Sequence, residues 1–398
     1  MTQATEILGT RRDSHARVIG AVSAAHFVSH YYIIILAPLL PFVRAEYGVS
    51  YTEIGIAIAA FNIVSAALQT PAGFLIDWLG ARLPLIGGLI IGAGAFLVIG
   101  LSHSYWLLVA LFALAGVGNT VYHPADYALL SQHVPNARIG QAFSVHTFAG
   151  MLGSAVAPPT LLAMQSVWGW RGAFIGAAML GFAAAALLLA ISDKGAAPVP
   201  RPGAEKDKAS WKLLLSPAIL LNLVFFVLLA MISGGTYNYS VVALAALYKT
   251  PVTIGNAALT AYLTLSALGV LTGGLLVSRT TRHGIVAASG LLLMTALTVL
   301  VAEIDLGTTL LIIAMALTGF FSGVIMPSRD MIVREVTPAG SFGKVFGFVT
   351  TGFNIGGIVS PLVFGAIMDH GSPRWVFLGI AAFTLVAVLT VTSRPRRA

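Results

Sequence analysis

The chain has 398 residues, of which 58% are hydrophobic and only 9% are charged. A soluble domain carries about 25% charged residues, so this composition cannot cover a water-exposed surface and indicates a membrane protein. The chain has no cysteine, which excludes disulfides, thiol catalysis and cysteine metal sites.

Apolar runs long enough to cross a bilayer, about 20 residues each, follow one another along the chain. The first follows Arg11, Arg12 and Arg17 and is too long and too polar for a signal peptide, so we expect a retained helix. We predict twelve transmembrane helices, at 18–42, 53–76, 83–101, 105–128, 139–163, 170–191, 217–247, 253–277, 284–302, 308–332, 342–367 and 374–392.

The basic residues predict the orientation of these helices, because cytoplasmic loops are enriched in Lys and Arg. With both termini in the cytoplasm, 17 of the 22 basic residues lie inside and four lie outside, namely Arg44, Arg171, Lys249 and Arg374. Arg329 alone falls within a predicted helix. The net charge of +8 is therefore a topology signal and not a nucleic-acid surface. We expect a multi-pass protein of the cell inner (plasma) membrane.

A polar segment from Ser192 to Lys212 contains three prolines and mixed charge, as expected of a flexible linker. We predict an N-terminal six-helix bundle at 1–192, a cytoplasmic linker at 193–213 and a C-terminal six-helix bundle at 214–398. The two halves match at an offset of 203 residues, so that Pro124 falls on Pro327 and Arg171 on Arg374. Six helices per repeat give parallel repeats with a substrate path between them.

The loop after the second predicted helix carries a family resemblance. It contains Gly73, Asp77, Gly80 and Arg82, a pattern that resembles the signature loop of the major facilitator superfamily. Trp78 and Ala81 occupy positions where that loop usually has Arg or Lys, and the corresponding loop of the second half has Ser278 in place of the acid. The resemblance implies an all-α fold of two pseudo-symmetric six-helix bundles, with the four residues of the first loop in conformational gating.

Two short motifs resemble the fosmidomycin-resistance branch of that superfamily. They are Val121-Tyr122-His123-Pro124 in the fourth predicted helix and His26-x-x-x-His30 in the first. In that branch an acid usually follows the proline directly, whereas here Ala125 intervenes before Asp126.

Ionisable residues inside membrane helices are costly and usually functional. Four are histidines: His26 and His30, which lie one helical turn apart, and His123 and His146. Four imidazoles without a central carboxylate suggest a proton-linked or anion-handling cavity, although each histidine could simply be hydrogen-bonded. We expect no zinc site, because nothing fixes a close ligand cluster without an acid or Cys.

The charged candidates each have two interpretations. Arg329 could bind a substrate anion through its guanidinium fork, or pair with Asp126, Asp330 or another acid and hold a gate. Asp126 could carry a proton, but the family resemblance favours its pairing with Arg82 in conformational gating. By the same resemblance, Asp77 meets the start of the eleventh helix, near Ser341 and Gly343, where unpaired N–H groups attract an acid.

A polar set could line the cavity, although each member could equally form a helix–helix hydrogen bond or lie at the membrane interface. Its main members are Tyr31, Asn119, Tyr122, Tyr237, Asn238 and Asn354. The glycines of the fifth and eleventh helices, including Gly150, Gly153, Gly356 and Gly357, predict close helix packing.

These patterns predict a secondary transporter and not an enzyme, because neither a catalytic triad nor a phosphate-binding Gly-x-x-x-x-Gly-Lys loop occurs in the sequence. We expect a monomer that uses alternating access to move a small anionic or amphipathic organic solute, coupled to protons, with export preferred. The alternatives are an uptake carrier for a small carboxylate and a transport-inactive receptor or scaffold. We expect no cofactor, metal or nucleic-acid partner.

Overall fold

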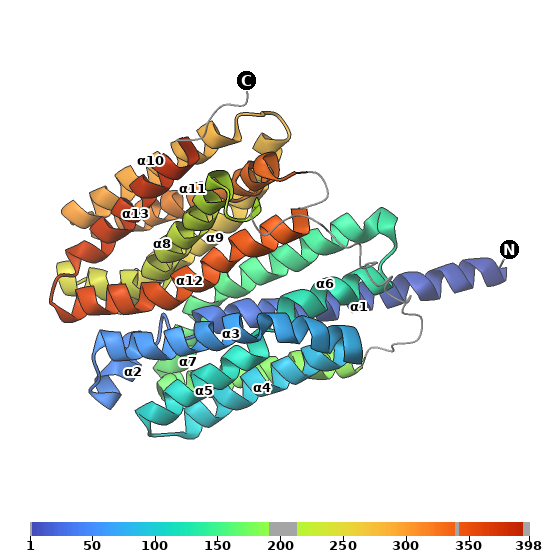
Figure 1. Ribbon diagram of the computed structural model, residues 1–398. Helices are drawn as coiled ribbons and strands as arrows, with labels where there is room; N and C mark the ends of the chain where they lie inside the picture. The colour runs from blue at the N-terminus through green and yellow to red at the C-terminus, as the bar shows by residue number, and fades with distance from the viewer. Residues whose placement is uncertain (1, 191–212, 339–341, 393–398) are drawn as a thin grey trace. The chain divides into compact units, whose positions relative to one another are not determined.

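The computed structural model describes residues 2–190, 213–338 and 342–392 (Figure 1). These residues form helices and contain no strand. The helices of the first part are α1 (Thr2–Ile34), α2 (Leu40–Tyr47), α3 (Tyr51–Leu79), α4 (Arg82–Leu101), α5 (Tyr105–Asn119), α6 (Tyr122–His133) and α7 (Asn136–Leu189). Those of the second part are α8 (Pro217–Tyr248), α9 (Val252–Val277), α10 (His283–Glu303), α11 (Gly307–Val336), α12 (Phe342–Asp369) and α13 (Arg374–Thr392).

Within the described ranges, ten helical segments are long and apolar enough to cross a membrane. One of them is α7, whose 54 residues would extend roughly 80 Å as a straight helix, far more than a bilayer requires. It contains Gly169 with φ 70° and ψ 171°, a conformation that interrupts the helix. The second part of α7 runs antiparallel to α4. Arg171, just after the interruption, donates to the carbonyl oxygen of Ser102 at the end of α4, whereas Arg82 at the start of α4 donates to the carbonyl oxygen of Leu188 near the end of α7. With two crossings in α7 and one in α1, the described helices agree with the predicted number of twelve crossings.

The predicted run at 18–42 is divided in the structure. The helix α1 ends at Ile34, a turn covers residues 35–39, and α2 begins at Leu40. Pro38 and Pro41 explain the interruption, since proline has no N–H for the helical ladder and restricts the residue before it. A second interruption, at residues 120–121, separates α5 from α6.

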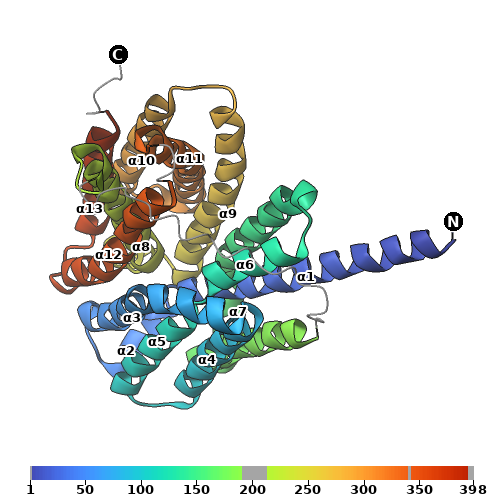
Figure 2. The same cartoon turned by 45° about the vertical axis from the view of Figure 1, so that its right-hand side comes forward.

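The chain forms two compact units. The first comprises Met1–Ile35 and Ile63–Gly203, and the second comprises Leu36–Asn62 and Ala204–Ala398. The helix α3 therefore contributes its first part to the second unit. Within the second unit α9 packs along α11 and α8 along α12 (Figure 2). The domain boundaries expected from the sequence stay a prediction, and most of the expected linker lies outside the described residues.

Small residues allow the helices of each unit to approach closely. In α4 and α5, a Cβ added to Gly88 would lie 2.7 Å from the Gly118 carbonyl oxygen, and one on Gly118 would lie 2.5 Å from the Gly88 oxygen. On α7, a Cβ at Gly153 would overlap the backbone of Phe27 in α1. Close packing through small residues is typical of membrane helices, so the glycine prediction is confirmed.

Large apolar side chains cover much of the outer helix surface. Examples are Leu271 and Leu292, which are 60% and 50% exposed. Trp106, Trp168 and Trp375 are also exposed; Trp106 and Trp375 are the second residues of α5 and α13, and Trp168 lies next to the interruption of α7 at Gly169. Lipid-facing helices with tryptophan at their ends are characteristic of membrane-spanning bundles.

Candidate functional site

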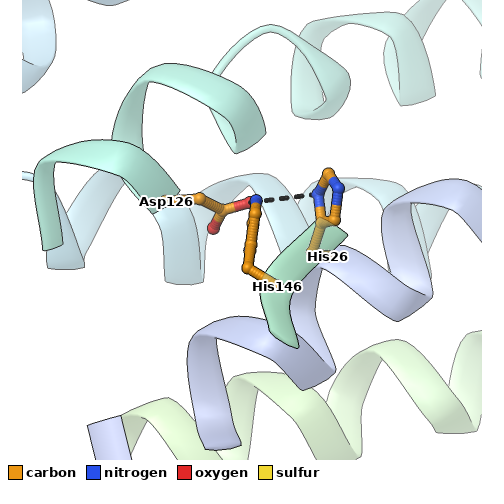
Figure 3. A group of neighbouring side chains, drawn as sticks. All are labelled: His26, Asp126 and His146. Atoms are coloured by element: carbon orange, nitrogen blue, oxygen red, sulfur yellow. Dashed lines mark ion pairs between the residues drawn. The ribbon is translucent and has the colours of Figure 1, made fainter. Parts of the chain in front are cut away.

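The first unit contains a group of ionisable side chains from three helices, which we call the His–Asp cluster: His26, His30, His123, Asp126 and His146. The helix α1 supplies His26 and His30, α6 supplies His123 and Asp126, and α7 supplies His146. Figure 3 shows the side chains of His26, Asp126 and His146 converging.

The interruption between α5 and α6 determines where Asp126 lies. The new helix starts at Tyr122, so Pro124 falls in its first turn, where a missing N–H leaves no helical bond unmade. His123 and Asp126 are three residues apart and lie on one side of α6.

The carboxylate of Asp126 lies between two imidazoles. Its Oδ2 is 3.4 Å from His26 Nδ1 and 3.8 Å from His146 Nε2. The rings of His26 and His146 stack, with centroids 3.8 Å apart and an interplanar angle of 23°. Asp126 and His146 are fully buried, and His26 is 4% exposed. This is an ionisable centre inside the membrane-spanning part of the unit.

The other two histidines extend the cluster from its buried centre. The His30 ring lies 4.6 Å from that of His26, and the His123 ring lies 5.2 Å from it. His30 Nδ1 is 3.2 Å from the Ser154 hydroxyl. His30 is half-buried and His123 is exposed. The cluster therefore runs from a buried carboxylate to an accessible imidazole.

The residue spacing on α7 explains why the helices meet here. His146, Gly150 and Ser154 are four residues apart, so they lie on one face of α7. Gly150 is against the two histidines of α1, because a Cβ there would be 2.5 Å from His26 Cδ2 and 3.0 Å from His30 Cδ2. A residue larger than glycine would separate α7 from the histidines. The i, i+4, i+8 pattern in the sequence was a signal for this face.

The centre of the cluster is poor in hydrogen bonds. Among the described residues, neither oxygen of Asp126, neither ring nitrogen of His146 and not Nδ1 of His26 has a hydrogen-bond partner. Buried charges are costly unless they are paired or bind a cation. Two imidazole nitrogens and a carboxylate are a donor set that can hold a proton or a metal ion.

The structure gives Asp126 neighbours other than the expected Arg82. Its carboxylate lies close to His26 and His146, and its pairing with Arg82 in conformational gating stays a prediction. Arg82 instead donates to the carbonyl oxygens of Leu188 and Leu189 at the C-terminal end of α7. The histidines do have a central carboxylate, so the reason given against a metal site was wrong.

Arg329 pairs with an acid, Asp330, as expected if it holds a gate. Its guanidinium is 2.8 Å from the adjacent Asp330 carboxylate and lies over the rings of Phe226 and Phe353, 4.8 and 5.2 Å from their centroids. Its side chain is 14% exposed. A role in substrate binding stays a prediction.

Several members of the expected polar set hydrogen-bond within their own unit. Tyr31 bonds Thr160, Asn119 bonds Ser65, Tyr122 bonds the Gly88 carbonyl, and Asn238 bonds the Gly234 carbonyl. Tyr237 lies edge-to-face with Tyr262, and Asn354 also has an interaction partner. Helix–helix bonds thus account for Tyr31, Asn119 and Tyr122, and the cavity-lining role stays a prediction.

The signature loop forms a tight connection between α3 and α4. Gly80 has φ 79°, a left-handed conformation that ends α3 at Leu79. The expected partner of Asp77 lies around Ser341, which is outside the described residues. Gating by Gly73, Asp77, Gly80 and Arg82 stays a prediction.

Sequence reasoning missed Asp369. This carboxylate accepts from the backbone N–H groups of Tyr51 and Thr52 at 2.7 and 2.8 Å and so caps α3 from the end of α12. The signal was a lone acid at a helix end, directly before His370 and Gly371, but its distant partners could not be read from the sequence.

The helices, their lipid-facing surface and the buried ionisable centre define an integral membrane protein with the architecture of a transporter. The family model for the Major Facilitator Superfamily matches residues 22–252 and 223–398. The chain belongs to this superfamily, as its signature loop indicated, and it is a multi-pass membrane transporter and not an enzyme.

Known transporters are similar to this chain over most of its length. The fosmidomycin resistance protein of Escherichia coli (strain K12) is 24% identical over 388 residues, which cover 94% of this chain and 92% of the relative. The hexuronate transporter of Bacillus subtilis (strain 168) is 22% identical over 383 residues, or 88% of each chain. A bacterial homologue of the human lysosomal transporter Spinster has the same fold, with a TM-score of 0.81, 12% identity, and 95% and 96% of the two chains covered.

Proposed function

We propose that this protein is a secondary active transporter that moves a small anionic or amphipathic organic solute across the inner membrane by alternating access. Transport is coupled to the proton gradient, and export is the preferred direction. Both termini lie in the cytoplasm.

The observation that carries this proposal is the His–Asp cluster. A charged group in the middle of a membrane helix costs about 2.5–3.5 kcal/mol on insertion scales, so such groups are found where transport requires them. Here a carboxylate and four imidazoles come from α1, α6 and α7. The cluster reaches from the buried Asp126 to the exposed His123, which suits a group that takes up and releases a cation.

The energy source follows from the sequence and the family. No phosphate-binding nucleotide loop occurs in the 398 residues, so transport has to use an ion gradient or the gradient of the solute. We assign coupling to His26, His123, Asp126 and His146. His30 and Arg329 are the groups we assign to an anionic solute, because imidazole and guanidinium both donate hydrogen bonds to oxyanions.

The relatives favour two kinds of solute. The relative named for fosmidomycin resistance supports export of a drug-like compound. The hexuronate transporter supports the second candidate, an uptake carrier for a small carboxylate. The two candidates differ in the direction of flux and share the coupling site.

The test is solute flux in proteoliposomes that contain a trapped pH-sensitive dye. Fosmidomycin and glucuronate serve as probes, each with and without an imposed pH gradient and with EDTA present. The expected result is flux of one probe that the gradient accelerates and that moves protons. We expect Asp126→Asn to insert normally and to lose gradient-driven flux. Flux that ignores the pH gradient refutes coupling, and no flux of a panel of small anions favours a receptor or scaffold.

A further inference from the structure

We propose that His26, Asp126 and His146 form a binding site for one divalent first-row transition-metal ion, and that the bound ion inhibits transport. Each of the three residues offers one ligand atom, and these atoms all lie within 4.8 Å of one another. They come from α1, α6 and α7, so a bound ion would tie three helices together.

The spacing of the ligand atoms suits a metal ion with small adjustments. Ligand atoms about 2.1 Å from a tetrahedral zinc ion are roughly 3.4 Å from one another. His26 Nδ1 and Asp126 Oδ2 already have that separation, at 3.4 Å, and His146 Nε2 is 3.8 Å from the same oxygen. The distances to Asp126 need only small shifts, but the stacked rings of His26 and His146, whose planes are 23° apart, must turn about their side-chain bonds so that both nitrogens face one ion.

The unsatisfied polar atoms point independently to a missing ligand. Within the described part of the chain, both carboxylate oxygens of Asp126 and both ring nitrogens of His146 are buried without a hydrogen-bond partner. Such atoms normally cost about 1–3 kcal/mol each. A cation held at the centre would satisfy the carboxylate and one nitrogen of each imidazole together.

The outer histidines provide the fourth position and the entry path. The rings of His30 and His123 lie 4.6 and 5.2 Å from that of His26. His123 is exposed at the surface of its unit, so an ion that enters on this side meets an imidazole before it reaches the buried carboxylate. Water or one of these imidazoles completes a four-coordinate site.

The donor set selects the class of ion. Two imidazoles and one carboxylate suit zinc, cobalt, nickel and ferrous iron, whereas calcium and magnesium prefer oxygen ligands. The inhibition rests on the proposed function: an ion at Asp126 occupies the group that we assign to the coupling cation and holds α1, α6 and α7 in one arrangement. The binding itself does not depend on transport.

The experiment titrates the purified full-length protein, without a polyhistidine tag, with Co²⁺ and follows the visible absorption of the metal. Zinc then displaces cobalt, and X-ray absorption of the zinc complex counts its imidazole ligands. We expect one equivalent with two or three imidazoles. Asp126→Asn and His146→Gln should each weaken binding by more than about 100-fold, because even second-shell partners contribute about 10–100-fold. His103→Gln, which changes an exposed histidine outside the cluster, should leave affinity unchanged.

Unfolding temperatures and elution profiles show whether each variant is folded. If Asp126→Asn does not fold, the affinity of the His146→Gln variant decides the proposal. Equal affinity in wild type and in a folded cluster variant overturns the proposal, because the metal then binds elsewhere. If the protein shows proton-coupled flux in EDTA but binds no metal in the titration, the metal site is refuted and the transport function stands. Metal binding without flux of any solute refutes the transport function and leaves the site standing, and flux that persists with zinc bound refutes the inhibition.

Discussion

Gly150 is the residue where a single methyl group best tests the His–Asp cluster. A Cβ at this position would lie 2.5 Å from His26 Cδ2, 2.6 Å from His26 Nε2 and 3.0 Å from His30 Cδ2. Carbon atoms in ordinary contact are about 3.5–4.0 Å apart, so Gly150→Ala requires about 1 Å of movement by His26 or by α1.

That movement acts directly on the ion pair, whose atoms are 3.4 Å apart. Overpacking by one methyl group in a close-packed interior costs about 1–3 kcal/mol. If the cluster bears this cost, the affinity of the site for Co²⁺ falls about 5- to 150-fold, since about 1.4 kcal/mol is a factor of ten. We expect gradient-driven flux to fall with it.

The assay combines the cobalt titration with flux in proteoliposomes. Gly94→Ala is the matched control, because in the described structure a Cβ at Gly94 meets no atom within 4 Å outside its own helix. That control should keep wild-type binding and flux and should be slightly stabilised, as for an unhindered helical Gly→Ala change. Wild-type affinity and flux in Gly150→Ala would show that the ring positions do not matter and would refute the reasoning.

Three further substitutions test other parts of the site and the fold. His30→Ala should weaken binding of the transported anion about tenfold by equilibrium titration, because it removes a donor next to Ser154; unchanged affinity would leave His30 a helix-bonding residue. Arg329→Ala should abolish flux while the protein still inserts, and normal flux would remove Arg329 from the mechanism. Asp369→Asn should lower the stability of the purified protein by about 1 kcal/mol, because one of the two oxygens that cap α3 becomes a donor facing an N–H; an unchanged unfolding temperature would argue against the cap.

The membrane helices could be predicted because each depends on local composition alone. Length and apolarity define a crossing, and the reversal inside α7 at Gly169 separates the two predicted runs at 139–163 and 170–191. The predicted pairing of His26 with His30 on one face of α1 also needed only helical geometry, and their rings are 4.6 Å apart. Their partners from other helices required more information.

Asp126 shows why the site could not be fully predicted. Each residue turns a helix by about 100°, so the face of Asp126 depends on where its helix starts. The interruption between Asn119 and Tyr122 restarts the helix, and a continuous fourth helix places the acid in a different direction. The family resemblance therefore suggested Arg82, whereas the structure gives His26 and His146.

The interruption between α5 and α6 occurs in only one of the two halves of the repeat that the structure describes. The offset of 203 residues places Asp126 opposite Arg329 and Pro124 opposite Pro327. In the first half the helix restarts, and its acid contacts histidines of two other helices. In the second half α11 runs unbroken from Gly307 to Val336, so Arg329 packs on aromatic rings and pairs with the adjacent acid. One duplicated position thus carries a carboxylate in one copy and a guanidinium in the other, which is the division of charge that the proposed coupling of a cation to an anionic solute would use.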